Sequence, residues 1–407
     1  MENSTRRWFP AAWMLVVLAA LVIAVPGANV ALAQDSDTPH IEVYGFVQAD
    51  YIQDFKRVDP AWNDTLRPSK IPTTDGQFGE DGQASLSAKQ SRLGVLMNFP
   101  TSNHPVYTKF EFDMFGVGVD AGQTTIRLRH AYGEWNHWLA GQTNTLFMDA
   151  SIFPNVVDYW GPNGMVFVRT PQIRWTPIHK SDSTFAVAIE KPGNDIDVGQ
   201  FSRFEDQGLA NFQANNEIPD ITAQYRMVQG WGHLQIAGIL RKLGIENTIN
   251  PANIVKRDDT GWGVDVTASI KVGDKDKVLL GFVTGAGIAT FMNDGGVDMA
   301  PTTANPLTTD AKAVDLTGIS AYFDHYWNSK WSSSIGYSYD EVDNLNGQNG
   351  SAFKKGDYFS ANILHTPADN ILIGAELLWG KREDFNGNSG NDSRIQFSLK
   401  YSFGAKL

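Results

Sequence analysis

Apolar and polar residues alternate along most of the chain with a period of two. In residues 394–403 the odd-numbered positions are apolar and the even-numbered ones are polar, and residues 262–272 are split in the same way. In a β-strand such alternation places apolar side chains on one face and polar ones on the other. The pattern therefore predicts an all-β fold.

Three features favour a transmembrane antiparallel β-barrel over a soluble β-sandwich. The alternating segments are often about ten residues long, as a tilted membrane strand requires, whereas soluble strands average about five or six. Aromatic residues such as Trp135, Trp138 and Trp331 lie near predicted strand ends, where an interfacial girdle would lie.

The connections between predicted strands alternate between short and long, which is the third feature. Residues 100–105 and 273–275 form short turns, whereas residues 192–217, 242–259 and 382–392 form long polar loops. Short turns on one rim and long loops on the other are typical of outer membrane barrels. We predict about 16 strands on this pattern, with both ends at the periplasmic rim.

The N-terminal segment predicts export. Arg6 and Arg7 precede an apolar run of about a dozen residues, and Ala31-Leu32-Ala33 supplies a small-x-small cleavage pattern. A retained membrane anchor is the alternative, but such a helix needs roughly 20 apolar residues. We therefore predict a signal peptide in residues 1–33 and a barrel in residues 34–407. The expected location is the outer membrane of a Gram-negative bacterium, with outer-membrane lipid around the strands.

Composition narrows the possible partners. The net charge of −12 argues against nucleic acid as a partner, and the chain contains no Cys. The eight His residues show no metal-ligand spacing and no hydrolase motif, so we expect no catalytic residues, no metal site and no cofactor. An enzyme, namely an outer membrane hydrolase, is the alternative function that the sequence leaves open.

Six basic residues are expected on the water-facing side of the N-terminal strands, because cations are costly against lipid. Arg127 and Arg129 are spaced to project from one face together with Ala131. Arg169 and Arg174 are five residues apart, so they share a face only if Pro171 marks a bulge. The predicted pore-lining set is Arg92, Lys109, Arg127, Arg129, Arg169 and Arg174.

These cations predict a channel for passive diffusion of small hydrophilic solutes that favours anions. The alternative is a general, non-selective porin, in which Glu111, Asp113 and Glu134 balance the cations.

Residues 148–165 are richer in apolar and aromatic residues than the other loops, as a loop packed inside a barrel would be. We expect this loop to narrow the pore, with Asp149 and Asp158 facing the basic strands. An ordinary external loop is the alternative. The expected constriction residues are Asp149, Asp158, Tyr159 and Trp160.

The chain resembles the DcaP-like family of trimeric outer membrane porins over most of its mature length. The segments that carry the resemblance are VYGF (43–46), SRLG (91–94), RLRHAYGE (127–134), LAGQT (139–143), FMD (147–149), GPNG (161–164), VR (168–169) and PQIR (171–174).

This resemblance implies a homotrimer of 16-stranded barrels with an inward-folded third loop that begins at Asp149. It also implies diffusion of small anionic solutes, dicarboxylates in particular, through a lumen lined by arginines. Carried over residue by residue, that lining is Arg92, Arg127, Arg129, Arg169 and Arg174.

Overall fold

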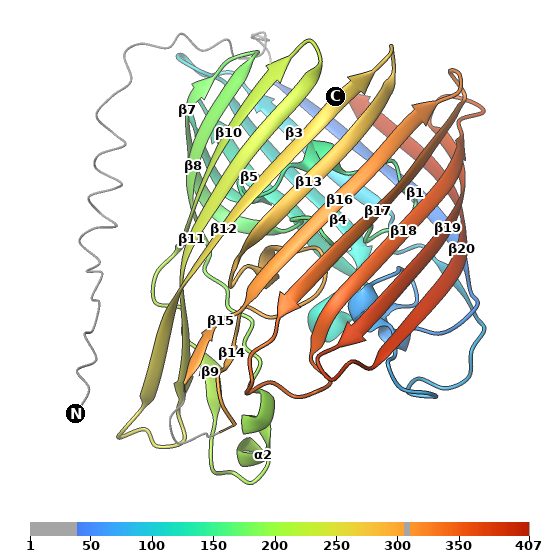
Figure 1. Cartoon of the computed structure of the whole chain (residues 1–407). Coiled ribbons are helices and arrows are strands. Elements are labelled where there is room, and N and C mark those ends of the chain that lie inside the picture. The colour runs from blue at the N-terminus through green and yellow to red at the C-terminus, as the bar shows by residue number, and fades with distance from the viewer. Residues whose placement is uncertain (1–38, 305–309, 407) are drawn as a thin grey trace.

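The computed structural model describes residues 39–304 and 310–406, so the predicted signal peptide lies outside the described residues. The described chain forms a closed antiparallel barrel of 16 strands, which confirms the predicted fold and strand number (Figure 1). The barrel strands are β1 (His40–Asp54), β3 (Arg92–Phe99), β4 (Val106–Phe115), β5 (Thr124–Trp135), β6 (Trp138–Asn144), β7 (Arg169–His179), β8 (Ser183–Glu190), β10 (Asp220–Gln229), β11 (Gly232–Asn247), β12 (Val255–Val272), β13 (Asp276–Ala286), β16 (Asp315–Tyr326), β17 (Trp331–Asp343), β18 (Phe353–His365), β19 (Ile371–Asp384) and β20 (Ser389–Lys406).

Ring closure comes from β1, which pairs antiparallel with β3 on one edge and with β20 on the other. No helix in the described part of the chain is long and apolar enough to cross a membrane. The remaining short elements are β2 (Gln83–Ser87), β9 (Phe212–Ala214), β14 (Met299–Pro301), β15 (Ala311–Ala313), α2 (Ser202–Glu205), η1 (Pro60–Trp62), η2 (Pro68–Lys70), η3 (Gly118–Asp120), η4 (Ala150–Ile152), η5 (Gly199–Phe201) and η6 (Ala289–Phe291).

The alternation of the strands separates an apolar outer surface from a polar lumen. On β12, Trp262 and Val264 are exposed on the outside, whereas Asp265 and Thr267 are buried toward the lumen. A strand side chain points to alternate faces with each residue, so the period of two sets this division.

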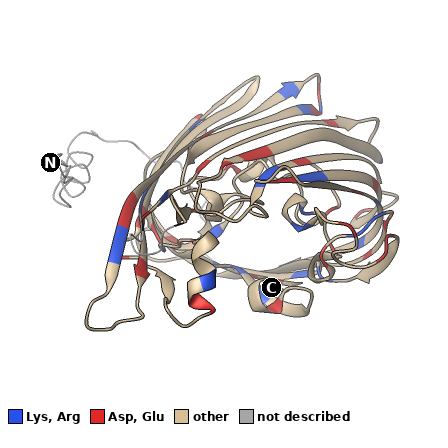
Figure 2. Ribbon diagram, turned by 60° about the horizontal axis from the view of Figure 1, so that its bottom comes forward, with Lys and Arg blue, Asp and Glu red and all other residues tan. Residues whose placement is uncertain are grey.

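Short turns lie at the upper rim in Figure 1, where the chain also ends, and long loops lie at the lower rim. The β5–β6 hairpin turns within two residues, because Asn136 adopts a left-handed conformation (φ 54°). Loop 1 (residues 55–82), loop 3 (145–168) and loop 6 (287–314, described without 305–309) bring side chains into one lumenal cavity. Figure 2 shows irregular segments inside the ring of strands.

Two of the long loops were predicted with the wrong bounds. Strands β11 and β12 continue to Asn247 and from Val255, within the predicted loop 242–259. Likewise β19 ends at Asp384 and β20 begins at Ser389, within the predicted loop 382–392. Beyond the apolar band both faces of a strand meet polar surroundings, so the alternation that marks a strand is lost there.

Arg241 on β11 anchors two external loops to the barrel wall. Its guanidinium is fully buried, with Nε 3.1 Å from Asp220 Oδ2 and Nη1 3.1 Å from Asp298 Oδ1 in loop 6. It also donates to the carbonyl oxygens of Gly193 and Gly287, and it lies 4.8 Å from the ring centre of Phe291. A buried arginine with its donors occupied joins loops 4 (residues 191–219) and 6 to the strands.

The substitution Arg241→Met should destabilise the barrel by about 3–5 kcal/mol, because it leaves Asp220 and Asp298 buried without their cation. Thermal unfolding in detergent, followed by circular dichroism, measures the effect. Arg203→Met on α2, where the side chain is exposed, is the matched control and should leave the midpoint unchanged. Equal midpoints for both variants would contradict an anchoring role for Arg241.

Candidate functional site

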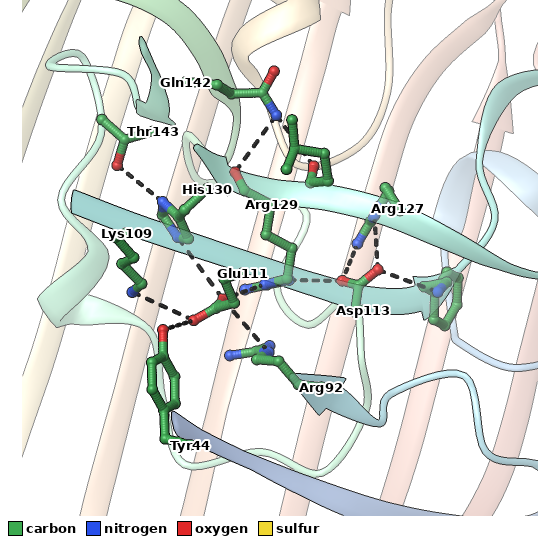
Figure 3. A network of polar contacts seen from close by, with 12 residues as sticks. Tyr44, Arg92, Lys109, Glu111, Asp113, Arg127, Arg129, His130, Gln142 and Thr143 are labelled. Carbon is green, nitrogen blue, oxygen red and sulfur yellow. Dashed lines mark hydrogen bonds and ion pairs between the residues drawn. The ribbon is translucent and has the colours of Figure 1, made fainter. Parts of the chain in front are cut away.

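Two carboxylates on β4 hold the arginines of the neighbouring strands on the inner wall (Figure 3). Arg127 Nη2 lies 2.7 Å from Asp113 Oδ2. Arg129 spans both acids, with Nε 2.7 Å from Glu111 Oε1 and Nη1 2.9 Å from Asp113 Oδ2. Arg92 on β3 approaches Glu111 at 3.7 Å. Three of the predicted lining arginines therefore belong to one ion-paired network.

The network has more cations than carboxylates. Lys109 Nζ lies 3.3 Å from Glu111 Oε2, and the Tyr44 hydroxyl donates to the same oxygen at 2.7 Å. The network has two acidic side chains, Glu111 and Asp113. Its basic side chains are Arg92, Lys109, Arg127 and Arg129. The excess charge of the network is thus positive.

A β-bulge in β5 determines which side chains join this network. Phe112 pairs with Leu128 and Glu111 pairs with His130, so Arg129 is an extra residue on β5. Because the bulge shifts the parity, Ala131 pairs with the outward-facing Phe110. The expectation that Ala131 shares a face with Arg127 and Arg129 is therefore wrong.

The two arginines of β7, Arg169 and Arg174, belong to opposite faces of the strand. The pairing of β6 with β7 runs without a register shift from Trp138 opposite Trp175 to Asn144 opposite Arg169, so Pro171 marks no bulge there. Arg174 donates to Gln172 Oε1 at 3.0 Å and to the carbonyl oxygen of Asn144 at 2.7 Å. Arg169, at the start of the strand, lines the same cavity as Arg127.

Asp149 and Asp158 do not face the basic strands, contrary to expectation. Asp149 accepts from Arg226 at 2.9 Å and contacts His233 at 2.7 Å, on the wall formed by β10 and β11. It also caps η4 by accepting from the backbone N–H of Ser151. Buried carboxylates need several donors, and the opposite wall provides them for Asp149.

Asp158 joins loop 3 to loop 1 instead. It accepts from the Thr65 hydroxyl at 2.7 Å, from the backbone N–H of Leu66 at 3.1 Å and from the Tyr358 hydroxyl at 3.1 Å. The backbone N–H of Val157 donates to Glu376 on β19. Loop 3 is thus fixed inside the barrel by carboxylates from the loop and from the wall.

Tyr159 and Trp160 carry loop 3 toward the arginine network. The Tyr159 ring stacks on Phe115 with ring centres 4.0 Å apart, and its hydroxyl contacts Arg127, Arg129 and Asp113. Trp160 meets Trp62 of loop 1 edge to face at 5.0 Å. Both aromatic rings line the cavity, with Arg127 beside them.

Loops 1 and 6 also contribute residues to this cavity lining, and sequence reasoning missed them. The Arg67 guanidinium contacts the rings of both Trp62 and Trp160, 4.2 and 4.5 Å from their centres, and pairs with Asp294 at 2.6 Å. Burial alone would raise the pKa of Asp294, but Arg67 and Ser69 hold it below its ordinary value. Loop 1 carries no alternation that would have indicated this inward position.

Lys70 and Arg382 complete the basic lining. Arg382 on β19 pairs with Asp384 at 2.7 Å and donates to the carbonyl oxygen of Ser69 at 2.6 Å. Burial and the nearby Arg67 lower the pKa of Lys70. Among the described residues, neither Lys70 nor Arg169 has a carboxylate oxygen within 4 Å, and Arg169 Nε is buried without a hydrogen-bond partner.

These residues enclose a cavity of about 770 Å³ at the external side of the network. Its charged lining consists of Arg67, Lys70, Arg127, Arg169, Arg382, Asp195 and Asp294. In six lumenal ion pairs the cation side chain is 16–26% exposed, whereas the carboxylate is at most 5% exposed. The charged groups exposed toward the cavity are therefore mainly positive. In the described ranges no cluster of His, Cys, Asp or Glu could hold a metal ion.

Comparisons with known proteins agree on the architecture. A family model described as DcaP outer membrane protein matches residues 26–403. The outer membrane channel DcaP of Acinetobacter baumannii is similar, with a TM-score of 0.74 and 25% identity, over 91% of this chain and 99% of that one.

Two further solved structures share the fold alone. OmpT of Vibrio cholerae in its trimer form has a TM-score of 0.54 and 12% identity, over 90% of this chain and 100% of that one. OmpF of Salmonella typhi in complex with daunomycin has a TM-score of 0.54 and 10% identity, over 89% and 97%. No curated protein matches the chain.

The contact between Arg67 and Asp294 should make stability depend on pH at the acid end. A lowered carboxylate pKa stabilises the fold above the ordinary aspartate value of about 3.9, and this stability is lost as the pH falls through the lower, folded value. The wild-type advantage over Asp294→Asn should thus be constant from about pH 6 to 8 and shrink below about pH 4.

Thermal unfolding in detergent at a series of pH values measures this difference. Asp75→Asn, at an exposed position of loop 1, the loop that carries Arg67, is the control and should match the wild type throughout. A wild-type advantage over Asp294→Asn that grows on acidification would contradict the assignment.

Proposed function

The chain belongs to the DcaP outer membrane protein family, and we propose that this outer membrane channel passes small anionic solutes by passive diffusion, with dicarboxylates favoured. Its family and fold relatives are channels and porins. The proposal concerns the sign of charge that the channel selects and the chemical class of its solutes.

The observation that carries the proposal is the unequal exposure of the two partners in the lumenal ion pairs. Arg127 is 21% exposed over a fully buried Asp113, and Arg226 is 24% exposed over Asp149, which is 1% exposed. An anion that approaches such a pair meets the guanidinium first, and the low-dielectric wall behind it strengthens the attraction. The buried acids hold the cations in place without presenting negative charge to the solute.

Lys70 and Arg169 are the residues that we expect to act most strongly on a passing anion. Both line the cavity, and an ion pair with a carboxylate neutralises neither of them in the described structure. Separate cations in one cavity suit a solute with two carboxylates.

The same proposal includes a homotrimer surrounded by outer-membrane lipid. The exposed residues on the outer surface of the barrel, such as Leu280, Phe282 and Ile319, are apolar, which suits contact with acyl chains. A fold relative, OmpT of Vibrio cholerae, has a trimer form.

Liposome swelling tests the solute preference directly. A small dicarboxylate should enter proteoliposomes faster than a monocarboxylate of similar size, and both should enter faster than a diammonium ion of that size. A neutral sugar gives the rate set by pore size alone. Equal rates for all charged solutes would instead indicate a general, non-selective porin, and absence of swelling would contradict a pore.

The double substitution Lys70→Gln and Arg169→Gln should reduce the ratio of dicarboxylate to diammonium entry. A loss of about 1 kcal/mol of attraction per charge corresponds to about fivefold per residue in that ratio. The sugar rate should stay close to that of the wild type, because Gln is of similar size.

Lys256→Gln with Arg257→Gln is the matched control. It removes the same two charges from the exposed external part of β12. An equal reduction in both double variants would attribute selectivity to the overall charge of the protein rather than to the cavity.

A further inference from the structure

A groove on the outer surface of the barrel lies across β12, β13, β16 and β17, which are neighbouring strands on one wall (Figure 1). It has a volume of about 390 Å³, and the outward side chains that line it are aliphatic or aromatic. In one row across the sheet, Ala268 lies between Leu234 and Leu280. In the same row, Ala321 lies between Leu280 and Tyr337. The two alanines between larger side chains leave a depression in the wall that faces lipid.

The groove reaches the external interface of the membrane at Tyr337. Tyr337, Phe359 and Trp379 pair in a single row on the outer face of β17, β18 and β19. Aromatic residues of outer membrane barrels gather where the hydrocarbon meets the headgroups. This row therefore marks the level at which an acyl chain in the groove would join its headgroup.

Two lysines lie beyond this row, toward the long loops. Lys381 follows Trp379 by two residues on the outward face of β19, and Lys355 occupies the outward face of β18. The Lys355 ammonium lies 4.8 Å from the ring centre of Tyr339 on β17. Among the described residues, neither lysine has a carboxylate oxygen within 4 Å. Both ammonium groups are therefore available to an anion outside the barrel.

Three carboxylates share this external patch, those of Glu341, Asp357 and Glu383. Two of them accept hydrogen bonds from tyrosine hydroxyls, since Tyr339 donates to Glu341 and Tyr337 donates to Asp357. The third, Glu383, pairs with Lys354 at 3.8 Å. In the described structure the patch thus offers a phosphate two lysines outside ion pairs, beside carboxylates that already have partners.

We infer that this wall binds lipopolysaccharide, the phosphorylated and acylated glycolipid of the external leaflet, with an acyl chain in the groove and a phosphate at Lys355 and Lys381. The inference rests on the proposed surroundings of outer-membrane lipid, and it names the lipid and the face that holds it. The groove buries part of an apolar chain, and the ammonium groups attract the phosphate. A phospholipid of the periplasmic leaflet has its headgroup at the opposite rim, so it does not join the two parts of this site.

Removal of the two lysines tests the headgroup contact. Lys355→Gln with Lys381→Gln should weaken the binding of purified rough lipopolysaccharide to the detergent-solubilised barrel by about fivefold for each lysine. Native mass spectrometry measures the bound fraction over a series of lipid concentrations. Lys275→Gln with Lys330→Gln removes the same charge from exposed positions at the short-turn rim. This matched control should bind the lipid as the wild type does.

A bulky residue in the groove tests the acyl contact. Ala321→Trp should weaken lipopolysaccharide binding by about tenfold, which is the equivalent of about two buried methylene groups. Ala223→Trp, at an outward alanine of β10 outside the groove, is the matched control and should bind like the wild type. Heat-modifiable gel mobility shows whether each barrel is folded, and the lysine variants decide alone if Ala321→Trp does not fold.

The outcomes separate the site, the lipid and the pore. Wild-type binding by Lys355→Gln with Lys381→Gln, or an equal loss in Lys275→Gln with Lys330→Gln, would overturn the headgroup site. Displacement of lipopolysaccharide by an equal concentration of phosphatidylglycerol would overturn the choice of lipid. The swelling rates report on the pore independently, so normal swelling without lipid binding would overturn this inference and leave the channel proposal intact.

Discussion

The exclusion of charge from hydrocarbon is the constraint on which the rest of this structure depends. A strand that crosses the membrane must turn its ionisable side chains toward the lumen, so cations and carboxylates from 16 strands share one enclosed space. Inside that space the two kinds of charge are placed differently: the carboxylates are buried, and several of their cation partners keep part of their surface exposed.

The carboxylates are buried, and they bind side chains and loops to the barrel wall and to one another. Asp113 and Glu111 hold the arginines of the wall, Asp294 holds loop 1 against loop 6, and Asp158 holds loop 1 against loop 3. Each accepts several donors, which compensates for its burial. The cations on the other side of these pairs keep part of their surface toward water. A protein with a net charge of −12 thereby has a lumenal cavity whose charged lining is mostly basic.

Sequence reasoning predicted the barrel well because alternation and loop lengths follow directly from membrane geometry. It placed Arg127 and Arg129 correctly relative to each other, since residues two positions apart on a strand point to the same face. It failed for Ala131, because one extra residue in β5 reverses the parity and leaves no mark in the composition. Loops provided even less information: nothing in the sequence around Arg67 indicates that Trp62 and Trp160, which are far apart in the chain, both contact it.

The central claim is that buried acids and partly exposed cations make the lumen favour anions. The reversal potential of the wild-type channel in a planar bilayer, recorded across a potassium chloride gradient, tests it most directly. Anion preference predicts a reversal potential displaced toward the chloride equilibrium potential, with a displacement that decreases as total salt rises and screens the lumen. A reversal potential displaced toward the potassium equilibrium potential would contradict the account.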